Sequence, residues 1–247
     1  MTRKKGKASI FKRMLLITEC SAVVLLLLLC AYKNNIPIVE EILGETKPDI
    51  VLDAGHGGFD SGAIYDDYYE KDITLEMTMD IGKMIEEAGY RVLYTRDSDD
   101  VDWADDEKGD LAYRGKVSNQ SGAKLFVSIH INSEEYDEGT SGYEVWADMG
   151  DDVAVTLANN ILEKVEPLDY SYNRGVQDER NYPLYLIYGN KIPAILLEAG
   201  FMGSANDQLY LFDSTYQKQF STKIAEGIIK TLEDMQKVED ASKKVEK

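Results

Sequence analysis

The chain contains only two histidines, and each follows or lies within an apolar run with the composition of a β-strand. His56 comes soon after Ile50-Val51-Leu52, in the glycine-rich segment LDAGHGGFDSGA, and His130 lies in LFVSIHIN. Glycines let a backbone bend tightly around a reactive side chain. Histidine acts as a metal ligand or as a general acid or base near neutral pH. Two histidines at the ends of expected strands therefore indicate a chemical site.

Strand periodicity predicts the direction of His130. Side chains alternate between the two faces of a strand, so His130 shares a face with Ser128 and Asn132, while the intervening isoleucines share the other. In open α/β sheets, ligands bind beyond the carboxyl ends of the strands. His56 leaves its strand at that same end. We therefore expect the two imidazoles to converge in a parallel arrangement.

A carboxylate is placed to complete a metal site with the two histidines. Glu70 lies just before an expected helix, in the loop that must return past the end of the first strand. Two histidines and one carboxylate with an open fourth position are the ligand set of a catalytic zinc site rather than a structural one. Ordinary core or surface histidines and a helix-start glutamate would have the same residue types. The residue types alone leave both interpretations open.

A second carboxylate, Glu198, ends the apolar run Ile195-Leu196-Leu197. A carboxylate at the end of a buried strand is partly desolvated, which raises its pKa and suits it to general acid or base catalysis. An exposed glutamate at a strand end is the alternative. Gly200 and Phe201 follow at once and indicate a tight turn that shapes a pocket, which favours the catalytic interpretation.

Apolar periodicity predicts the elements that position these side chains. Strands alternate with helices, which is typical of a parallel sheet covered on both faces. We expect one α/β domain with a twisted, mostly parallel (mixed) six-stranded sheet flanked by helices on both faces. The expected strands are Asp49–Asp53, Tyr90–Thr95, Lys124–Asn132, Tyr143–Trp146, Pro183–Tyr188 and Ala194–Glu198, and the expected helices are Lys71–Gly89, Leu111–Ser121, Asp151–Val165 and Thr215–Val238.

The N-terminal segment predicts export. Residues 1–13 carry six basic side chains and precede an apolar stretch, 14–32, that is long enough to span a membrane. Flanking basic residues keep that end in the cytoplasm, so we expect an uncleaved anchor with the rest of the chain outside. A cleaved signal peptide, and hence a secreted protein, is the alternative, although no small-x-small site follows the apolar stretch. Residues 33–48 are expected to form a stalk, 49–238 the catalytic domain, and 239–247 a frayed, charged tail.

The exported part is strongly acidic. Of the 27 basic and 45 acidic residues, six basic and one acidic lie in residues 1–32, which leaves a formal charge of −23 on residues 33–247. Such a surface repels phosphate backbones, so we expect no nucleic-acid partner. Both cysteines, Cys20 and Cys30, lie in the apolar stretch. The domain itself therefore needs no disulfide.

Several sequence blocks in a fixed order resemble those of a known enzyme family. They are LDAGHGGFDSGA, EKDITLE, YRVLYTRDSD, LAYRGKVSN leading into AKLFVSIHINS, SGYEVW, NRGV and IPAILLEAGFMGS. With these blocks the chain resembles the zinc-dependent N-acetylmuramoyl-L-alanine amidases of bacterial cell walls, the amidase-3 type, over residues 48–236. A single block would be a weak match, whereas this many in the correct order are highly specific.

The resemblance implies a role for each candidate residue. His56, Glu70 and His130 fall on the family's zinc ligands, so the implied cofactor is Zn²⁺. Glu198 falls on the catalytic glutamate. Arg114 matches a recurring arginine of the family, whose role could equally be structural.

Two positions depart from the family's pattern. Thr74 stands where the family usually has an asparagine, and Ser204-Ala205 stand where an asparagine often follows Gly-Phe, with Asn206 close behind. Neither position is one of the implied ligands. The departures therefore bear on substrate preference and leave the chemistry intact.

The resemblance implies a monomeric catalytic domain that hydrolyses peptidoglycan between N-acetylmuramic acid and the L-alanine of the stem peptide. A zinc peptidase that cuts within the stem peptide, and an inactive amidase-like wall-binding protein, are the alternatives. A small domain behind a membrane anchor, without wall-binding repeats, also resembles germination-type amidases that modify spore cortex. Cell separation or wall turnover stays open as a setting, and the sequence indicates no particular protein partner.

Overall fold

The computed structural model describes residues 47–101, 106–133 and 139–245. These residues belong to one unit, Lys47–Lys247. The expected basic tail and membrane anchor, and all but the last two residues of the expected stalk, lie outside the described ranges. Within these ranges, no helix is both long enough and apolar enough to cross a membrane.

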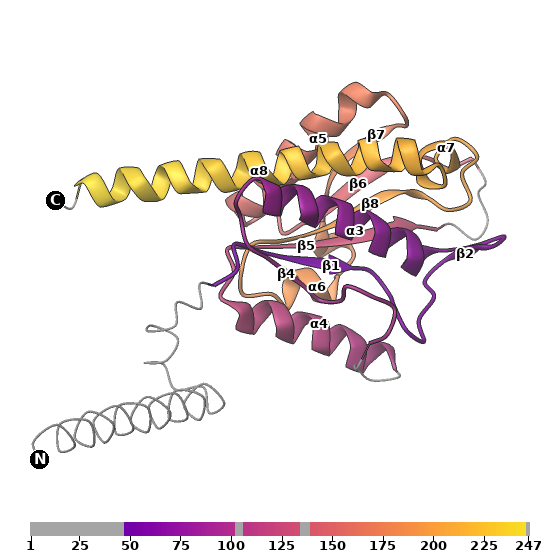
Figure 1. The fold of residues 1–247 in the computed structure, drawn as a ribbon, viewed down its shortest axis with the longest axis horizontal. Coiled ribbons are helices and arrows are strands. Elements are labelled where there is room, and N and C mark those ends of the chain that lie inside the picture. Colours follow the sequence, from indigo (N-terminus) through magenta and orange to yellow (C-terminus); the bar gives the residue numbers. More distant parts are fainter. Residues whose placement is uncertain (1–46, 102–105, 134–138, 246–247) are drawn as a thin grey trace, which may run out of the picture. The chain divides into compact units, whose positions relative to one another are not determined.

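A six-stranded sheet forms the centre of the fold (Figure 1), with the strand order β4-β1-β5-β8-β6-β7. The four strands from β4 to β8 run parallel, whereas β6 is antiparallel to β8 and parallel to β7. The expected mixed, mostly parallel six-stranded sheet is therefore confirmed. The strands are β1 (Ile50–Ala54), β4 (Val92–Tyr94), β5 (Leu125–Asn132), β6 (Tyr143–Ala147), β7 (Asn173–Asp178) and β8 (Ala194–Phe201).

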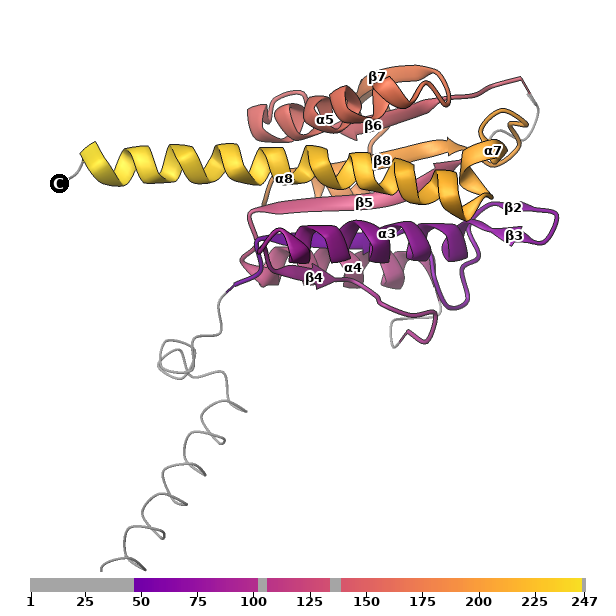
Figure 2. The same cartoon turned by 45° about the horizontal axis from the view of Figure 1, so that its top comes forward.

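Helices cover both faces of this sheet, which is why its central strands are buried and mostly apolar. One face is covered by α3 (Glu70–Glu87), α5 (Asp152–Val165) and α8 (Ser214–Val245), and the other by α4 (Glu107–Ser121) and α6 (Tyr185–Tyr188). Figure 2 shows α3 and α8 side by side across β1, β5 and β8, with α5 beside β6 and β7.

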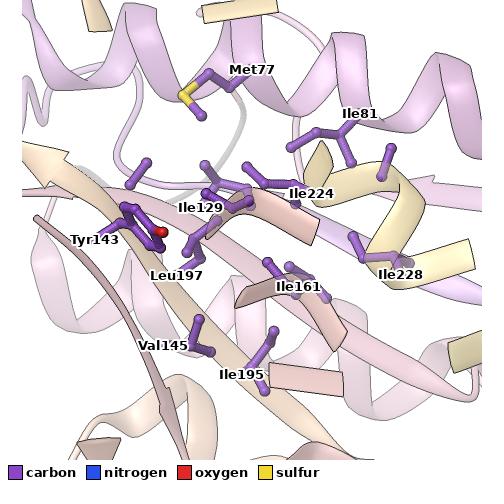
Figure 3. Close-up of a cluster of buried hydrophobic side chains, with 14 of the residues drawn as sticks. Met77, Ile81, Ile129, Tyr143, Val145, Ile161, Ile195, Leu197, Ile224 and Ile228 are labelled. Carbon is purple, nitrogen blue, oxygen red and sulfur yellow. The ribbon is translucent and has the colours of Figure 1, made fainter. Parts of the chain in front are cut away.

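The larger core lies between the sheet and the α3–α5–α8 layer. Met77 and Ile81 of α3 and Ile224 of α8 point toward the sheet and meet Ile129 and Leu197 there (Figure 3). Because side chains alternate along β5, burial of Ile129 on this face directs His130 toward the opposite face. Packing of the core thus fixes the orientation of the functional strand residues.

One predicted strand is wrong. Pro183–Tyr188 does not join the sheet, because its last four residues form the helix α6, in which Leu186 and Ile187 are buried while Tyr185 and Tyr188 are exposed. The sixth strand is instead β7, an edge strand that pairs with β6. The number of strands was therefore predicted correctly, but not the identity of the last one.

The final helix is longer than expected. It runs to Val245, so the expectation of a frayed tail from Glu239 is wrong as far as the described residues reach. An ion pair of 3.0 Å between Lys124 and Glu239 attaches this part of the helix to the domain. The other predicted elements are present, with ends that differ by a few residues.

Some short elements were not predicted. They are the hairpin of β2 (Ile64–Tyr65) and β3 (Tyr68–Tyr69), the helix α7 (Gln208–Leu211), and two 3₁₀ turns, Glu166–Leu168 and Glu179–Asn181.

Candidate functional site

The candidate residues meet at the carboxyl ends of β1, β5 and β8. His56 lies two residues beyond β1, and His130 and Glu198 are register partners on the neighbouring strands β5 and β8. Glu70 is the first residue of α3 and is almost fully buried. The structure therefore brings together all four residues that the sequence singled out, at the sheet edge where parallel strands place ligands.

His56, Glu70 and His130 form a compact cluster of side chains that could bind a metal ion. The Oε1 atom of Glu70 lies 3.0 Å from Nε2 of His56 and 3.1 Å from Nδ1 of His130. The three donor atoms all lie within 4.8 Å of one another. Tetrahedral zinc with bonds of about 2.0–2.1 Å separates its ligand atoms by about 3.3 Å. The size and chemistry of the cluster therefore fit a single metal ion such as zinc.

Neighbouring side chains contact both imidazoles. Nδ1 of His56 is 2.7 Å from Oδ2 of Asp60, so the other ring nitrogen faces Glu70. Nη2 of Arg114 lies 3.2 Å from Nε2 of His130, and Nδ1 of that ring faces Glu70. A carboxylate such as Asp60, which accepts from the second ring nitrogen, fixes the ring orientation of a metal-binding histidine.

Two glycines make room for the cluster. A Cβ atom on Gly55 would lie 2.6 Å from Cε1 of His130, and one on Gly62 would lie 2.6 Å from both Oε2 of Glu70 and Cδ2 of His56. Gly62 also has a φ of +64°, which strains any residue with a side chain. The glycine-rich loop thus allows close approach of the functional side chains.

Two residues at the positions that depart from the family's pattern, Thr74 and Ser204, are buried. Thr74 is fully buried and donates a 2.7 Å hydrogen bond to the carbonyl of Gly55. Ser204 is 3% exposed, and its hydroxyl accepts from the backbone N–H of Asp207. Thr74 and Ser204 therefore face the interior, whereas Ala205 is exposed, and the expected link with substrate preference stays a prediction.

Arg114 forms a buried ion pair with Asp53 of β1. Its Nε and Nη2 atoms donate to the two carboxylate oxygens at 2.9 and 2.6 Å. Burial alone would raise the pKa of Asp53, but the charge and hydrogen bonds of Arg114, with those of Ser128 and Thr95, hold that pKa well below its usual range. Arg114 therefore has a structural role, and it also contacts a candidate metal ligand.

Glu198 has the environment of a general acid or base. Its Oε2 atom is shielded from solvent and has no hydrogen-bond partner among the described residues. Burial raises the pKa of Glu198 well above its usual range, and the negative charges of Glu70 and Glu144 add to that rise. Glu144 is its direct partner across β6 and β8. A carboxyl group of raised pKa can both accept and donate a proton near neutral pH.

Glu70 and the two histidines shift one another's pKa values. Burial raises the pKa of Glu70, but hydrogen bonds from both histidines outweigh that effect and hold the pKa far below its usual range. Burial lowers the pKa of His56, yet Glu70 and Asp60 raise it overall. For His130, burial dominates and lowers the pKa. Glu70 is thus an anionic ligand candidate, and the lowered pKa of His130 favours its neutral form, the form that binds metals.

A hollow of about 360 Å³ opens onto these groups. One side is lined by the histidines, Arg114 and Glu198, and the other by residues of the segment from Tyr182 to Tyr188. Pockets of this size with a few convergent polar groups are typical binding sites.

Sequence reasoning missed several residues that shape the site. Asp60 stands four residues after His56, a spacing that could have suggested a partner for the imidazole. Asp53 and Glu144 carried no such signal, because their partners Arg114 and Arg174 lie 61 and 30 residues away. Only the three-dimensional structure joins them.

Comparison with known proteins gives a consistent result. A family model described as N-acetylmuramoyl-L-alanine amidase (Amidase_3) matches residues 50–230. A germination-specific N-acetylmuramoyl-L-alanine amidase of Bacillus subtilis is 30% identical over 191 residues, which cover 73% of this chain and 78% of that relative.

Solved structures share the fold. The CwlD amidase from Clostridioides difficile, in complex with the GerS lipoprotein, is 32% identical with a TM-score of 0.68, covering 75% of this chain and 98% of that chain. The N-acetylmuramoyl-L-alanine amidase AmiC2 of Nostoc punctiforme is also 32% identical, with a TM-score of 0.65, covering 74% of this chain and 96% of that chain.

Proposed function

The chain belongs to the N-acetylmuramoyl-L-alanine amidase family, and on that basis we propose how its residues hydrolyse peptidoglycan. Its activity is cleavage of the amide bond between N-acetylmuramic acid and the L-alanine of the stem peptide. The observation that carries the mechanism is a shielded carboxylate, Glu198, on the strand next to that of His130.

His56, Glu70 and His130 are the proposed zinc ligands. Their donor atoms lie close together, and two nitrogens with one carboxylate oxygen leave a fourth position open to substrate or water. A bound zinc ion supplies a Lewis acid that polarises the scissile carbonyl and lowers the pKa of a nearby water toward about 7. Asp60 keeps the imidazole of His56 in the required orientation, and Arg114 contacts the ring of His130.

Glu198 is the proposed general base and acid. Its carboxylate takes a proton from the attacking water, and the water oxygen bonds to the carbonyl carbon. The carbon–nitrogen bond then breaks, and Glu198 passes the proton to the amine of L-alanine. Its raised pKa suits both steps, because a group that first accepts and then donates a proton works best near the ambient pH.

The proposed location is the outer side of the cell membrane, with residues 14–32 as the anchor. The apolar composition of this stretch and the basic residues before it support that location. The similarity to a germination-specific amidase supports a role in spore cortex modification. The complex of a structural neighbour with a lipoprotein supports a search for a protein partner at the same membrane.

Digestion of purified peptidoglycan tests the catalytic assignment. The wild-type chain is expected to release peptides with a free N-terminal L-alanine, which mass spectrometry separates from the products of a peptidase acting inside the stem. Glu198→Ala should abolish release while bound zinc, measured by plasma mass spectrometry, is unchanged. Glu226→Gln, a change on the opposite side of the sheet in α8, should keep full activity. Unchanged amidase products from Glu198→Ala would refute the assignment.

A further inference from the structure

Three exposed tyrosines line the same hollow as Glu198. Tyr182, Tyr185 and Tyr188 are 66%, 40% and 59% exposed, and all three border the opening. We call these residues the tyrosine wall. Large aromatic side chains that are exposed together in a hollow are typical of binding sites, and nothing in the proposed chemistry uses them.

The fold holds the tyrosine wall in place. Leu186 and Ile187, between the second and third tyrosines, are buried and anchor α6 against the sheet. Asn119 of α4 donates a 2.9 Å hydrogen bond to the carbonyl of Gly189 just beyond the helix. The ring of Tyr185 packs over α4, where a Cβ on Gly115 would lie 3.1 Å from it. A wall fixed in this way binds a ligand with little loss of side-chain entropy.

A tryptophan extends the aromatic surface. The ring of Trp146 lies 6.2 Å from that of Tyr182, and the rings of Tyr185 and Tyr188 meet edge to face at 5.7 Å. The indole N–H of Trp146 donates to Glu144, the cross-strand partner of Glu198. The aromatic surface therefore reaches Glu144, the cross-strand partner of the catalytic carboxylate.

The chemistry of the hollow selects a neutral, ring-shaped ligand. The part of its lining from Tyr182 to Tyr188 has no charged side chain, so it offers no ion pair to a charged stem peptide. The flat C–H face of a pyranose ring packs well on the electron-rich face of an aromatic ring. Tyrosine hydroxyls can also donate to and accept from sugar hydroxyl and acetamido groups.

We propose that the tyrosine wall binds the sugar rings of the glycan strand, on the acyl side of the scissile amide. The inference rests on the proposed function, because that function places the muramoyl carbonyl at Glu198 and a neighbouring sugar within reach of α6. Binding through the wall would hold a polymeric substrate while the peptide leaves.

A titration with a sugar that lacks any peptide tests the wall directly. The probe is an N-acetylglucosamine tetrasaccharide, and the reporter is Trp146 in a full-length Trp103→Phe chain, since the sequence has only two tryptophans. We expect a saturable fluorescence change. Tyr185→Ala and Tyr188→Ala should each weaken binding by about two- to tenfold. Tyr185→Phe keeps the ring and should retain most of the affinity, and Tyr216→Ala on α8 should have no effect.

A comparison of substrates separates this inference from the proposed function. Muramoyl peptides with one sugar and with four sugars are digested by the wild-type chain and by the tyrosine variants. The wild type should have the lower KM for the longer substrate, and Tyr185→Ala or Tyr188→Ala should remove that advantage with little change in kcat. A wild type that releases no peptide from either substrate refutes the function. Release without dependence on sugar number, or sugar binding that is unchanged in both alanine variants, overturns the role of the wall.

Discussion

Arg114 and Asp53 form an ion pair inside the domain, with both side chains at most 2% exposed and two parallel hydrogen bonds between them. Nη2 of the same guanidinium lies 3.2 Å from Nε2 of His130. One side chain therefore links the buried charge of β1 to a candidate metal ligand on β5. Such a residue affects stability and the metal site together.

Arg114→Met should destabilise the domain and weaken zinc binding. Removal of one partner leaves the carboxylate of Asp53 buried without compensation, which typically costs about 3–5 kcal/mol. Urea denaturation measures the loss, and competition with a chelator measures zinc affinity. Arg180→Met removes an exposed ion pair with Asp178 and should change neither quantity appreciably. Equal effects of the two substitutions would contradict the role given to Arg114.

Acid should weaken the contribution of Asp53. The pKa of its carboxyl is lower in the folded than in the unfolded state, so the unfolded state binds more protons between these two values. The stabilisation is thus complete above about pH 4, the unfolded pKa, and is lost as the pH falls, by up to about 1.4 kcal/mol per pH unit. The difference in unfolding free energy between wild type and Asp53→Asn should therefore shrink from pH 6 to pH 3. A constant difference would rule out this linkage.

Much of the site was predictable from local sequence patterns. The alternation in β5 gave the direction of His130, because burial of Ile129 on one face leaves the other face for the imidazole. The strand ends gave the location of His56 and Glu198, because parallel strands carry their functional residues at one edge. These predictions depend only on residues close in the chain.

The sixth strand was not predictable in the same way. β7 has the sequence Asn173-Arg-Gly-Val-Gln-Asp178, with a single large apolar residue, so no period-two pattern marks it. Its strand conformation comes from backbone pairing with β6 across the chain. In the stretch that was assigned to this strand, the exposed tyrosines Tyr185 and Tyr188 are three residues apart, a helical spacing that the short apolar run concealed.

Removal of the charge of Glu144 should shift the pH dependence of catalysis. Burial, Glu70 and Glu144 all raise the pKa of Glu198, so Glu144→Gln should lower that pKa. A general base must be deprotonated, and the acid limb of the kcat/KM profile should therefore move to lower pH. Glu226→Gln removes an equal charge at a partly buried position in α8, where it is paired with Lys223, and should leave the limb in place. A limb that moves in neither variant would mean that Glu198 does not set it.

Zinc should stabilise the folded chain through the three clustered ligands. A ligand that binds only the folded state adds about 2.7 kcal/mol at one hundred times its Kd, so the thermal midpoint should rise with zinc concentration and fall with a chelator. His56→Ala or Glu70→Gln should abolish most of this dependence. Asp234→Asn, in the exposed part of α8, should preserve it. A midpoint independent of zinc in the wild type would exclude the cluster as a zinc site.

A comparison of two glycines with similar backbone conformation separates the effect of backbone strain from the effect of space beside the site. Gly62 and Gly89 both have positive φ angles, +64° and +93°, so replacement by alanine at either position should cost about 1–2 kcal/mol of stability. Only the Cβ at position 62 would meet site atoms, since nothing lies within 4 Å of one at position 89.

Gly62→Ala should therefore do more than destabilise the chain. Its Cβ would force apart Glu70 and His56, which supply two of the three donors, and metal sites tolerate little change in donor position. We expect a loss of at least tenfold in zinc affinity and a matching loss of activity, whereas Gly89→Ala should lose stability alone. Zinc titration and peptide release, measured well below both melting temperatures, distinguish the two. Equal losses of zinc affinity in both variants would mean that Gly62 is needed for its backbone conformation and not for the space that it leaves beside Glu70 and His56.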